Sequence, residues 1–497
     1  MLYPTDLFRR GSVFDLNSFK QNLHSRVFPN APAGMFSFGD PGVNKAFTHD
    51  KFTNFAPRLG LAWNPHNGRQ TFRVGAGIFY DSTMVWWSQR MTSNPPVVNE
   101  IDLLNVPING QTPATANFTN PWVGFNGGNP FPGVFPPNSS VGFPDNGLWF
   151  ILPNHFQPMY VAQWNASYQI QFGGDWLATV SYLGNKSTHV PLSTNLNYAV
   201  ANPACIAAGT CTTKNTAARR VLAQLQTTPS QNAGKIANLI IGDDGANANY
   251  NALLASLQHR FGHHFTLLAN YTYSHCLSQG DFLGDMTGGR YQDPTNRAAE
   301  YGPCNFDIRH NFNSSLVASS SVKRGGWVGW LLGDWQLAPS VRLTSGIPLN
   351  ILDGSDNSLN GEGLDRPNVV SGVARYVNHY GASGTSLFYQ VLNKAAFVNA
   401  PAGTFGNLTR NAIYAPGAVS VDMSVSRFFP VRERMQVETR FEAFNAINHA
   451  NLDPTKMVVN LNNANFGRIT GVSNPTFPGN PSPYDPRILQ LALKLHF

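Results

Sequence analysis

Eleven segments of this 497-residue chain alternate apolar and polar residues, and the stretches between them are alternately short and long. The segments are residues 56–64, 71–80, 158–172, 175–184, 248–261, 264–275, 307–319, 334–346, 417–428, 434–446 and 487–497. The stretches between them hold 6, 77, 2, 63, 2, 31, 14, 70, 5 and 40 residues. Unstructured loops longer than about 15 residues are uncommon in compact domains. The spacing is typical of an outer-membrane β-barrel with tight turns on one side and long loops on the other.

The alternation within the segments predicts strands with one apolar and one polar face. At the carboxyl end one face would carry Leu489, Leu491, Leu493, Leu495 and Phe497, and the other Gln490, Ala492, Lys494 and His496. Strands in soluble sheets are usually about five or six residues long, whereas roughly 9 to 11 residues are needed to cross a bilayer at a tilt. We therefore expect an all-β fold, an antiparallel up-and-down transmembrane β-barrel of which this chain supplies about 11–12 strands. An extracellular β-sandwich or propeller is the alternative.

The barrel interpretation also predicts an orientation. The short turns at 65–70, 173–174, 262–263, 320–333 and 429–433 would face the periplasm, and the long segments would face the cell exterior. A barrel that begins and ends in the periplasm has an even number of strands, so at least one further strand is expected before residue 56. We accordingly divide the chain into residues 1–55, an N-terminal loop region with the end of a preceding strand, and residues 56–497, the barrel segment.

Composition excludes several classes of protein. Only 12% of the residues are charged, about half of the usual share of roughly 25% in soluble proteins. The net charge of +7 is not gathered into a basic stripe, so nucleic acid is not an expected partner. No apolar run approaches the roughly 18 residues of a spanning helix. Residues 1–15 lack the apolar core of a signal peptide, which implies a protein that stays inside the cell or a missing natural N-terminus.

The four cysteines lie in loop-like sequence, as they do in exported proteins. Cys276 ends one strand and Cys304 precedes the next on the same side, so the two could form a disulfide across adjacent antiparallel strands. Cys205 and Cys211 could close a small loop. The alternative is four free thiols that happen to lie in loops.

The sequence offers no catalytic motif, and neither an enzyme nor a cofactor is expected. There is no G-x-S-x-G, H-E-x-x-H or phosphate-binding loop, and the glycine pair Gly75 and Gly77 lies inside a strand. The pair His263 and His264 is better explained as a turn than as a metal site, because no acidic or sulfur partner is near in sequence.

Two acidic groups fall in loops. The stretch 353–368 carries Asp353, Asp356, Glu362 and Asp365 among glycines and asparagines. Oxygen ligands of this kind could bind calcium, but the spacing is not that of an EF-hand, and an ordinary acidic surface loop is the simpler interpretation. The second group is Asp243, Asp244, Asp281 and Asp285. Nothing beyond residue type supports it as a glycosidase pair.

Several blocks resemble Oar-like TonB-dependent outer-membrane receptors. They are FAPRLGLAWNP (55–65), FRVGAGIFYD (72–81), NFDIRHNF (305–312), DWQLAPSVRLTSGIPLNI (334–351), PAGTFGN (401–407), Arg410-Asn411, RFEAFNAINHANL (440–452) and LQLALKLHF (489–497). The resemblance implies a plug domain inside a barrel of about 22 strands, with uptake driven by an inner-membrane energy complex. This chain resembles only the C-terminal part of such a barrel, without the plug. The resemblance also makes Leu493, Leu495 and Phe497 the signal that the barrel assembly machinery reads.

The expected function is therefore that of an outer-membrane receptor or transporter barrel for energy-coupled uptake. Its expected partners are outer-membrane lipid, the assembly machinery, a small-molecule, peptide or saccharide ligand, and the TonB complex through the missing plug region. One alternative is a surface adhesin or carbohydrate-binding protein that uses the barrel as an anchor. Another is a secreted β-rich enzyme.

Overall fold

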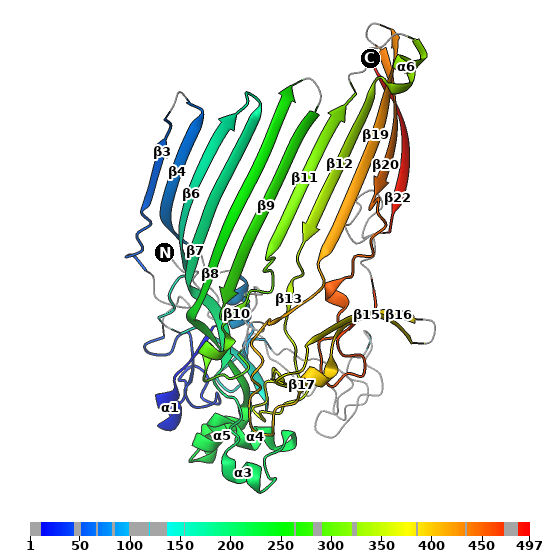
Figure 1. The fold of residues 1–497 in the computed structure, drawn as a ribbon. Coiled ribbons are helices and arrows are strands. Elements are labelled where there is room, and N and C mark those ends of the chain that lie inside the picture. Colours follow the sequence, from blue (N-terminus) through cyan, green and yellow to red (C-terminus); the bar gives the residue numbers. More distant parts are fainter. Residues whose placement is uncertain are drawn as a thin grey trace.

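A single large antiparallel sheet contains all eleven expected segments (Figure 1). The computed structural model describes residues 11–43, 51–65, 68–81, 85–98, 119, 137–153, 155–262, 265–281, 291–320, 326–383, 386–432, 435–471 and 486–497. The strands are β3 (Arg58–Trp63), β4 (Gln70–Tyr80), β6 (Tyr160–Phe172), β7 (Trp176–Asn195), β8 (Ile236–Gly262), β9 (Phe265–Ser278), β11 (His310–Ser319), β12 (Trp335–Thr344), β19 (Ala418–Arg432), β20 (Met435–Phe444) and β22 (Ile488–His496). Each pairs with the next in this order. The predicted up-and-down antiparallel topology is confirmed.

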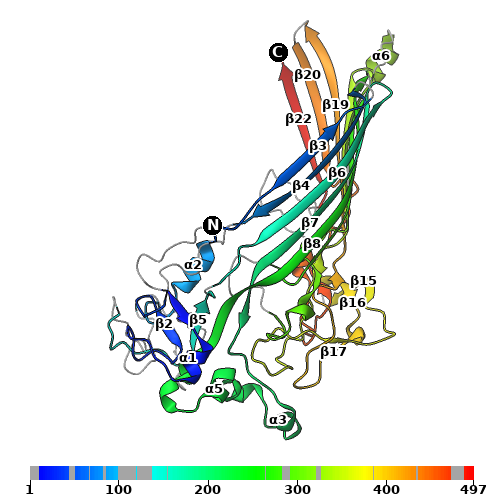
Figure 2. The ribbon, with the colours of Figure 1, turned by 90° about the vertical axis from the view of Figure 1, so that its left-hand side faces the viewer.

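The sheet is curved, and its two ends differ (Figures 1 and 2). At one end, which we call the short-turn end, strands are joined by tight turns and the chain finishes. At the other, the long-loop end, the long connections gather into one mass. Among the pairings of the described strands, β3 contacts only β4 and β22 contacts only β20, so these two strands form the edges of the sheet.

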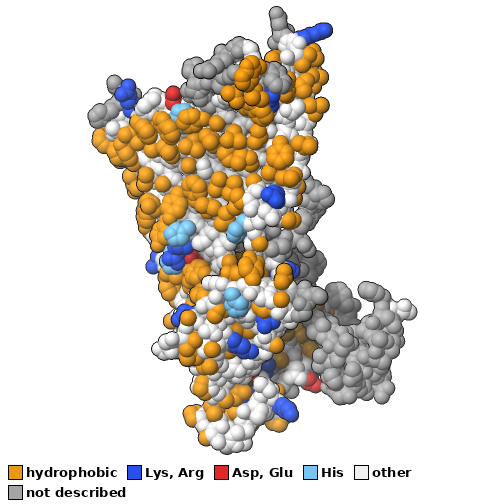
Figure 3. Space-filling model, turned by 45° about the vertical axis from the view of Figure 1, so that its right-hand side comes forward, with side chains coloured by type: hydrophobic (Ala, Val, Ile, Leu, Met, Phe, Trp, Pro, Cys, Tyr) orange, Lys and Arg blue, Asp and Glu red, His pale blue; other side chains and the backbone are white. Residues whose placement is uncertain are grey.

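The strand register separates an apolar face from a polar face. Directly opposed residues project to the same side of a sheet, and Leu491 is opposite Phe441, which is opposite Val425. One residue along, Ala492 is opposite Arg440. Large apolar side chains on the first face are exposed, Leu491 by 82%. Hydrophobic side chains accordingly cover a broad zone over the strands in Figure 3, whereas charged and polar side chains interrupt the surface nearer the loops.

Aromatic side chains mark both ends of the apolar face. Near the short-turn end, the Trp176 ring lies 4.5 Å from that of His259, which lies 4.2 Å from that of Phe265. Toward the long-loop end, the Tyr80 and Tyr160 rings are 5.7 Å apart. Two aromatic girdles that flank an apolar band are the pattern of a membrane-spanning barrel.

Two strands are longer than the sequence predicted. The expected boundaries at 184 and 248 are wrong, because β7 continues to Asn195 and β8 already begins at Ile236. Within these extensions Leu192, Leu239 and Ile240 are all buried. β5 (Gly147–Ile151) also pairs with β8, in parallel. Since both faces of the extensions are packed, and irregularities interrupt the register after Thr188, the alternation of period two that reveals an amphipathic strand is lost there.

The long connections pack into a structured mass, here called the loop layer. One of its hydrophobic cores includes Phe19, Trp149, Leu222, Ile236 and Leu239, and another includes Ile351, Leu392, Phe397, Ile413 and Phe466. Its short strands are β1 (Ser12–Phe14), β2 (Met35–Ser37), β10 (Gly302–Pro303), β13 (Pro348–Leu349), β14 (Asn368–Val369), β15 (Tyr376–Ser383), β16 (Ser386–Leu392), β17 (Phe397–Val398), β18 (Ile413–Tyr414) and β21 (Arg468–Ile469). Within the described ranges, the long connections are thus compact and ordered.

Helices are short and lie in the connections. They are α1 (Leu16–Lys20), α2 (Val85–Met91), α3 (Pro203–Ala207), α4 (Thr216–Arg219), α5 (Val221–Leu225) and, at the short-turn end, α6 (Gly326–Leu332), with 3₁₀ turns η2 (Thr213–Asn215), η3 (Pro229–Gln231), η4 (Ala233–Lys235), η5 (Arg297–Glu300), η6 (Lys394–Ala396) and η7 (Pro454–Lys456). None of the helices in the described ranges has the length and apolar character needed to span a bilayer. Residues 11–43 contribute β1, α1 and β2 to the loop layer and no strand to the large sheet, while residues 1–10 lie outside the described residues.

The architecture predicts which end of the sheet faces the cell exterior. Gly174, in the turn between β6 and β7, and Gly372, in the loop layer, both have left-handed φ angles and open space around them, so each can receive a short epitope tag. We expect antibody added to intact cells to label the tag after Gly372 and not the tag after Gly174. Both tags should be detected once the outer membrane is permeabilised. Labelling of only the Gly174 tag on intact cells would reverse the orientation.

Candidate functional site: the polar face and the loop layer

An ionic cluster occupies the polar face where β19, β20 and β22 meet. The Glu438 carboxylate is almost fully buried. It accepts hydrogen bonds from Arg440 Nε at 2.6 Å and Ser426 Oγ at 3.0 Å, and His496 Nε2 lies 2.9 Å from its other oxygen. Arg440 also reaches Glu442 at 3.5 Å. Since every charge in this cluster has a partner, it forms a fixed polar wall rather than a reactive centre.

The rest of the polar face carries amide and hydroxyl groups. Arg73 donates to the Gln169 side chain at 2.9 Å, and Asn313 donates to Asn311 at 2.9 Å. Within the described ranges, no group of three or more His, Cys, Asp or Glu side chains converges as a metal site would require. The polar face thus carries hydrogen-bonding groups that are mostly uncharged, and the charges of the Glu438 cluster are paired. Such a surface suits the passage of a polar solute.

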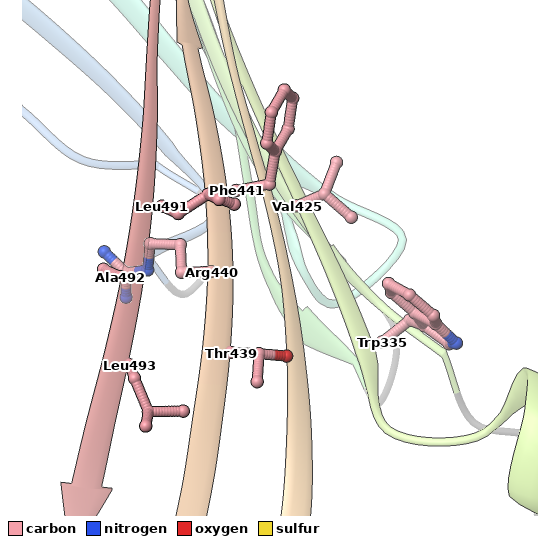
Figure 4. A pocket seen from close by; sticks show the side chains of 8 residues that line it. All are labelled: Trp335, Val425, Thr439, Arg440, Phe441, Leu491, Ala492 and Leu493. Carbon is pink, nitrogen blue, oxygen red and sulfur yellow. The ribbon is translucent and has the colours of Figure 1, made fainter.

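A groove of about 480 Å³ lies at the apolar face of β12, β19, β20 and β22 (Figure 4). It is lined by Trp335, Val425, Thr439, Arg440, Phe441, Leu491, Ala492 and Leu493. Figure 4 shows the Arg440 and Phe441 side chains pointing away from each other on β20, and most of the other lining residues are apolar. Its surroundings suit a hydrocarbon chain rather than a polar ligand.

Arg410 connects the loop layer to the long-loop end of the sheet. Its buried guanidinium donates to the Glu300 carbonyl at 2.9 Å and to the Ser278 carbonyl at 2.6 Å, and it forms an ion pair with Asp281. Burial lowers the pKa of Arg410, and the carboxylates of Asp281 and Glu300 oppose that shift. Because Ser278 ends β9 while Asp281 and Glu300 belong to the connection that follows, one side chain fixes this connection against the strand.

A second buried ion pair extends the same network. Arg366 and Glu300 approach to 2.7 Å, and each side chain is only 3% exposed. Glu300 also accepts from the Gln292 backbone N–H at 3.0 Å, and Arg366 Nε donates to the Leu408 carbonyl at 2.9 Å. Through Arg366 and Arg410 together, Glu300 is connected to segments 66 and 110 residues away in sequence, and the arrangement holds these connections of the loop layer together.

The sequence alone does not mark this network. Arg410 belongs to a block that resembles the receptor family, and no motif or spacing distinguishes Glu300 and Arg366. A cue was present, since charged residues make up only 12% of the chain and an arginine inside a loop rich in glycine and asparagine is therefore conspicuous. Which carboxylate each arginine binds could not be read from spacing, because the partners lie in different connections.

Both cysteine pairs are close in the structure. Disulfides join Cys205 to Cys211 and Cys276 to Cys304, with Cα–Cα distances of 5.2 and 5.4 Å. These distances fall within the usual range for a disulfide. The Cys276–Cys304 bridge is buried beside the short ladder between β9 and β10. Closure of a loop of this length stabilises a fold by roughly 3.5 kcal/mol in the chain-entropy model.

The proposed assembly residues lie at the carboxyl end. Leu493 and Leu495 project from the apolar face of β22, with exposures of 75% and 52%. Phe497 follows the strand and is 94% exposed. They are therefore accessible to a partner protein, and their role in assembly stays a prediction.

The acidic loop at 353–365 is more buried than its composition indicates. Asp353 and Asp365 are 0% and 1% exposed, respectively. Asp356 accepts from the backbone N–H groups of Asn360 and Gly361 at 3.0 Å each. Burial raises the pKa of Asp365 to about 6, with further contributions from the charges of Asp356 and Asp353, and burial also raises the pKa of Asp353.

The other candidate residues do not form a site. Asp243 binds the Arg297 guanidinium through both carboxylate oxygens, at 2.6 and 2.7 Å, and also accepts from the Tyr291 hydroxyl. Asp281 is held by Arg410, and Asp244 accepts from the Gln157 backbone N–H. Gly75 and Gly77 lie inside β4 as expected. The remaining candidates, Asp285, His263 and His264, lie outside the described residues.

Replacement of Arg410 tests how far the loop layer depends on it. Arg410→Ala leaves the Asp281 carboxylate and several buried carbonyl groups without their donor, and loss of one partner of a buried ion pair costs about 3–5 kcal/mol. We expect amides of residues 291–304 to exchange hydrogen much faster in mass-spectrometric measurements. Arg487→Ala, the same change at an exposed arginine, is the control and should leave exchange unchanged. Equal protection of these amides in both variants would contradict the network.

Asp365 should make the stability of its loop depend on pH. A carboxyl group whose pKa is higher in the folded than in the unfolded state stabilises the fold only while it is protonated. This contribution is complete below about pH 4 and is lost as the pH rises through 6, a change of roughly 3 kcal/mol for two pKa units. In metal-free buffer we expect amides of residues 352–366 to lose protection between pH 5 and pH 7. Asp365→Asn should abolish the dependence, and Asp453→Asn, at a partly exposed aspartate in another connection, should keep it.

Comparisons with known proteins extend these observations. The chain is similar to the outer membrane transporter YddB from Escherichia coli, with 8% identity and a TM-score of 0.45, over 89% of this chain and 40% of that one. It is also similar to a mutant of the ferric enterobactin receptor PfeA from Pseudomonas aeruginosa, with 10% identity, a TM-score of 0.39, and coverage of 89% and 40%. A third similar structure is that of the FrpB iron transporter from Neisseria meningitidis. Its identity is 8% and its TM-score 0.35, over 80% of this chain and 35% of that one. The chain spans less than half the length of each.

No curated protein matches the chain. The model of the family described as the outer membrane beta barrel domain, however, matches residues 3–490. This range includes every strand of the large sheet except residues 491–496 of β22. The chain therefore belongs to the family of outer membrane beta barrel domains, and it resides in the bacterial outer membrane.

Proposed function

We propose that this chain is the barrel part of an Oar-like TonB-dependent receptor that takes up a ligand across the outer membrane. The observation that carries the proposal is the combination of a lumenal polar face with a loop layer held by buried ion pairs. The polar face of the sheet offers hydrogen-bonding groups with paired charges to a passing solute. The loop layer lies at the opposite end of the strands from the carboxyl terminus. It offers a surface that can recognise the solute first.

The order of the loop layer favours a receptor over a passive pore. A passive pore needs loops that leave its mouth open, and it does not require them to present a rigid binding surface. Here the loops hold hydrophobic cores of their own, and the pair of Glu300 and Arg366 lies almost fully out of water. Rigid loops lower the entropy cost of binding, which is an advantage for capturing a scarce ligand.

The proposal includes energy coupling, which would depend on segments that are not among these 497 residues. In this view a plug region supplies the contact with the TonB complex, and further strands complete the barrel. The two edge strands, β3 and β22, support this, because unpaired backbone groups in hydrocarbon cost several kcal/mol each. Leu493, Leu495 and Phe497 would be the residues through which the assembly machinery recognises the barrel.

Uptake measurements test the proposed function. Wild-type cells should deplete from their medium a compound that remains when the gene carrying this chain is deleted, and untargeted mass spectrometry of spent medium would identify it. The same compound should remain in the medium of cells that lack the TonB complex, because transport of this kind needs the energy it delivers. A matched strain lacking an unrelated outer-membrane porin is the control.

Two results would contradict the receptor. Depletion that persists without the TonB complex would indicate a passive pore. Binding of a saccharide or of a host surface by whole cells, with no uptake and no dependence on TonB, would indicate the adhesin alternative.

A further inference from the structure

A charged side chain lies beside the groove on the apolar face of the sheet. Arg427 of β19 is directly opposite Trp335 on β12 and Thr439 on β20, and Thr439 is opposite Leu493 on β22. The three neighbours of Arg427 in this row all line the groove. On the lipid side of a barrel a charge costs about 2–4 kcal/mol at the bilayer midplane and less near the interface. A charged side chain in such a place is therefore a candidate for binding an oppositely charged group.

Two aromatic rings hold the Arg427 guanidinium near the short-turn end. Its central carbon lies 5.2 Å from the centre of the Trp335 ring and 4.7 Å from the centre of the Phe429 ring. A guanidinium that stacks on aromatic faces keeps its N–H donors in its own plane, where they match the oxygens of a phosphate in pairs. Since Trp335 is the first residue of β12, this anion-binding group lies close to the end of the spanning strands.

The groove changes from polar to apolar along the strands. At its end toward the short turns it begins at the level of Arg427 and Thr439. Two residues further along each strand, its walls are Val425, Phe441 and Leu491, which lie directly opposite one another. Figure 4 shows Thr439 below Phe441 and Leu491 in this arrangement. A cation followed by a hydrocarbon surface is complementary to a phospholipid, whose phosphate is followed by acyl chains.

A short apolar helix marks the depth of this site in the membrane. α6 exposes Trp327 by 75%, Leu331 by 47% and Leu332 by 50%. The Trp335 indole N–H donates to the Leu331 carbonyl at 2.8 Å, so the ring beneath Arg427 also holds the helix. Exposed tryptophan and leucine side chains at the end of a spanning sheet suit the boundary between lipid head groups and acyl chains. The helix therefore indicates that Arg427 lies at the level of the head groups.

We propose that the groove binds one phospholipid molecule, with the phosphate on Arg427 and an acyl chain along Val425, Phe441 and Leu491. The bilayer supplies this partner directly, because the chain resides in the outer membrane. The groove volume of about 480 Å³ falls within the roughly 300–1,000 Å³ of sites that hold small molecules. A second copy of this chain fits less well, since a two-fold contact would bring two Arg427 side chains together.

Lipid binding to the protein purified from outer membranes in mild detergent tests the phosphate contact. Native mass spectrometry with added phosphatidylglycerol should show one molecule per chain bound more tightly than any further ones. Arg427→Gln should weaken this binding about tenfold, the loss expected for one charge-assisted hydrogen-bonding group. Arg342→Gln is the matched control, because Arg342 is an exposed arginine on the polar face of β12. It should bind the lipid as the wild type does.

The acyl chain is tested by filling the groove. Val425→Phe should displace the lipid, because the larger side chain occupies the space between β19 and β20. Val421→Phe makes the same change on the same face of β19, outside the groove, and should leave binding unchanged. Diacylglycerol, which has the acyl chains without the phosphate, should bind the wild type about as weakly as phosphatidylglycerol binds Arg427→Gln.

Three outcomes would overturn the site. The first is equal binding of phosphatidylglycerol and diacylglycerol by the wild type, a result that does not depend on how well any variant folds. The second is undiminished lipid binding in both Arg427→Gln and Val425→Phe, which would place the lipid elsewhere. The third is displacement of the lipid by millimolar inorganic phosphate, which would show a site for a free anion rather than for a lipid.

Discussion

The structure depends first on the pairing of backbone N–H and C=O groups in the hydrocarbon of the bilayer, which offers no hydrogen-bond partners. Within hydrocarbon each strand must find donors and acceptors in its neighbours. Strands joined in chain order satisfy this with the shortest connections, and the register of β19, β20 and β22 shows the result. Once backbone groups are paired in this way, the side chains have only two faces to occupy, and the alternation of apolar and polar residues follows.

A second constraint governs the loop layer, where water is present but the chain is long. Connections of this length gain little from local structure, so their order must come from contacts between distant segments. Two hydrophobic cores supply part of that order. The buried side chains of Arg410, Arg366 and Glu300 fix how these segments are oriented, because a planar guanidinium donates best to acceptors placed to match its N–H groups.

The membrane-facing part of the sheet and the loop layer are joined by strands that belong to both. β7 and β8 leave the apolar band and continue into the loop layer, where β5 extends the sheet alongside β8. The contact of Arg410 with the end of β9 and the bridge between Cys276 and Cys304 fasten the neighbouring connection at the same level. A ligand held by the loops would therefore rest on elements that continue into the wall of the barrel.

The sequence by itself determined the strands of the sheet, their order, their faces and the side on which the long connections lie. This was possible because the lipid requires every spanning strand to be amphipathic, and Leu489 to Phe497 display that requirement directly. Tertiary structure alone decided the rest. The extensions of β7 and β8 are packed on both faces, so no period marks them, and the partners of Arg410 and Arg366 lie in other connections. The burial of Asp353 and Asp365 was hidden for the same reason, since composition cannot show which parts of a polar loop the fold removes from water.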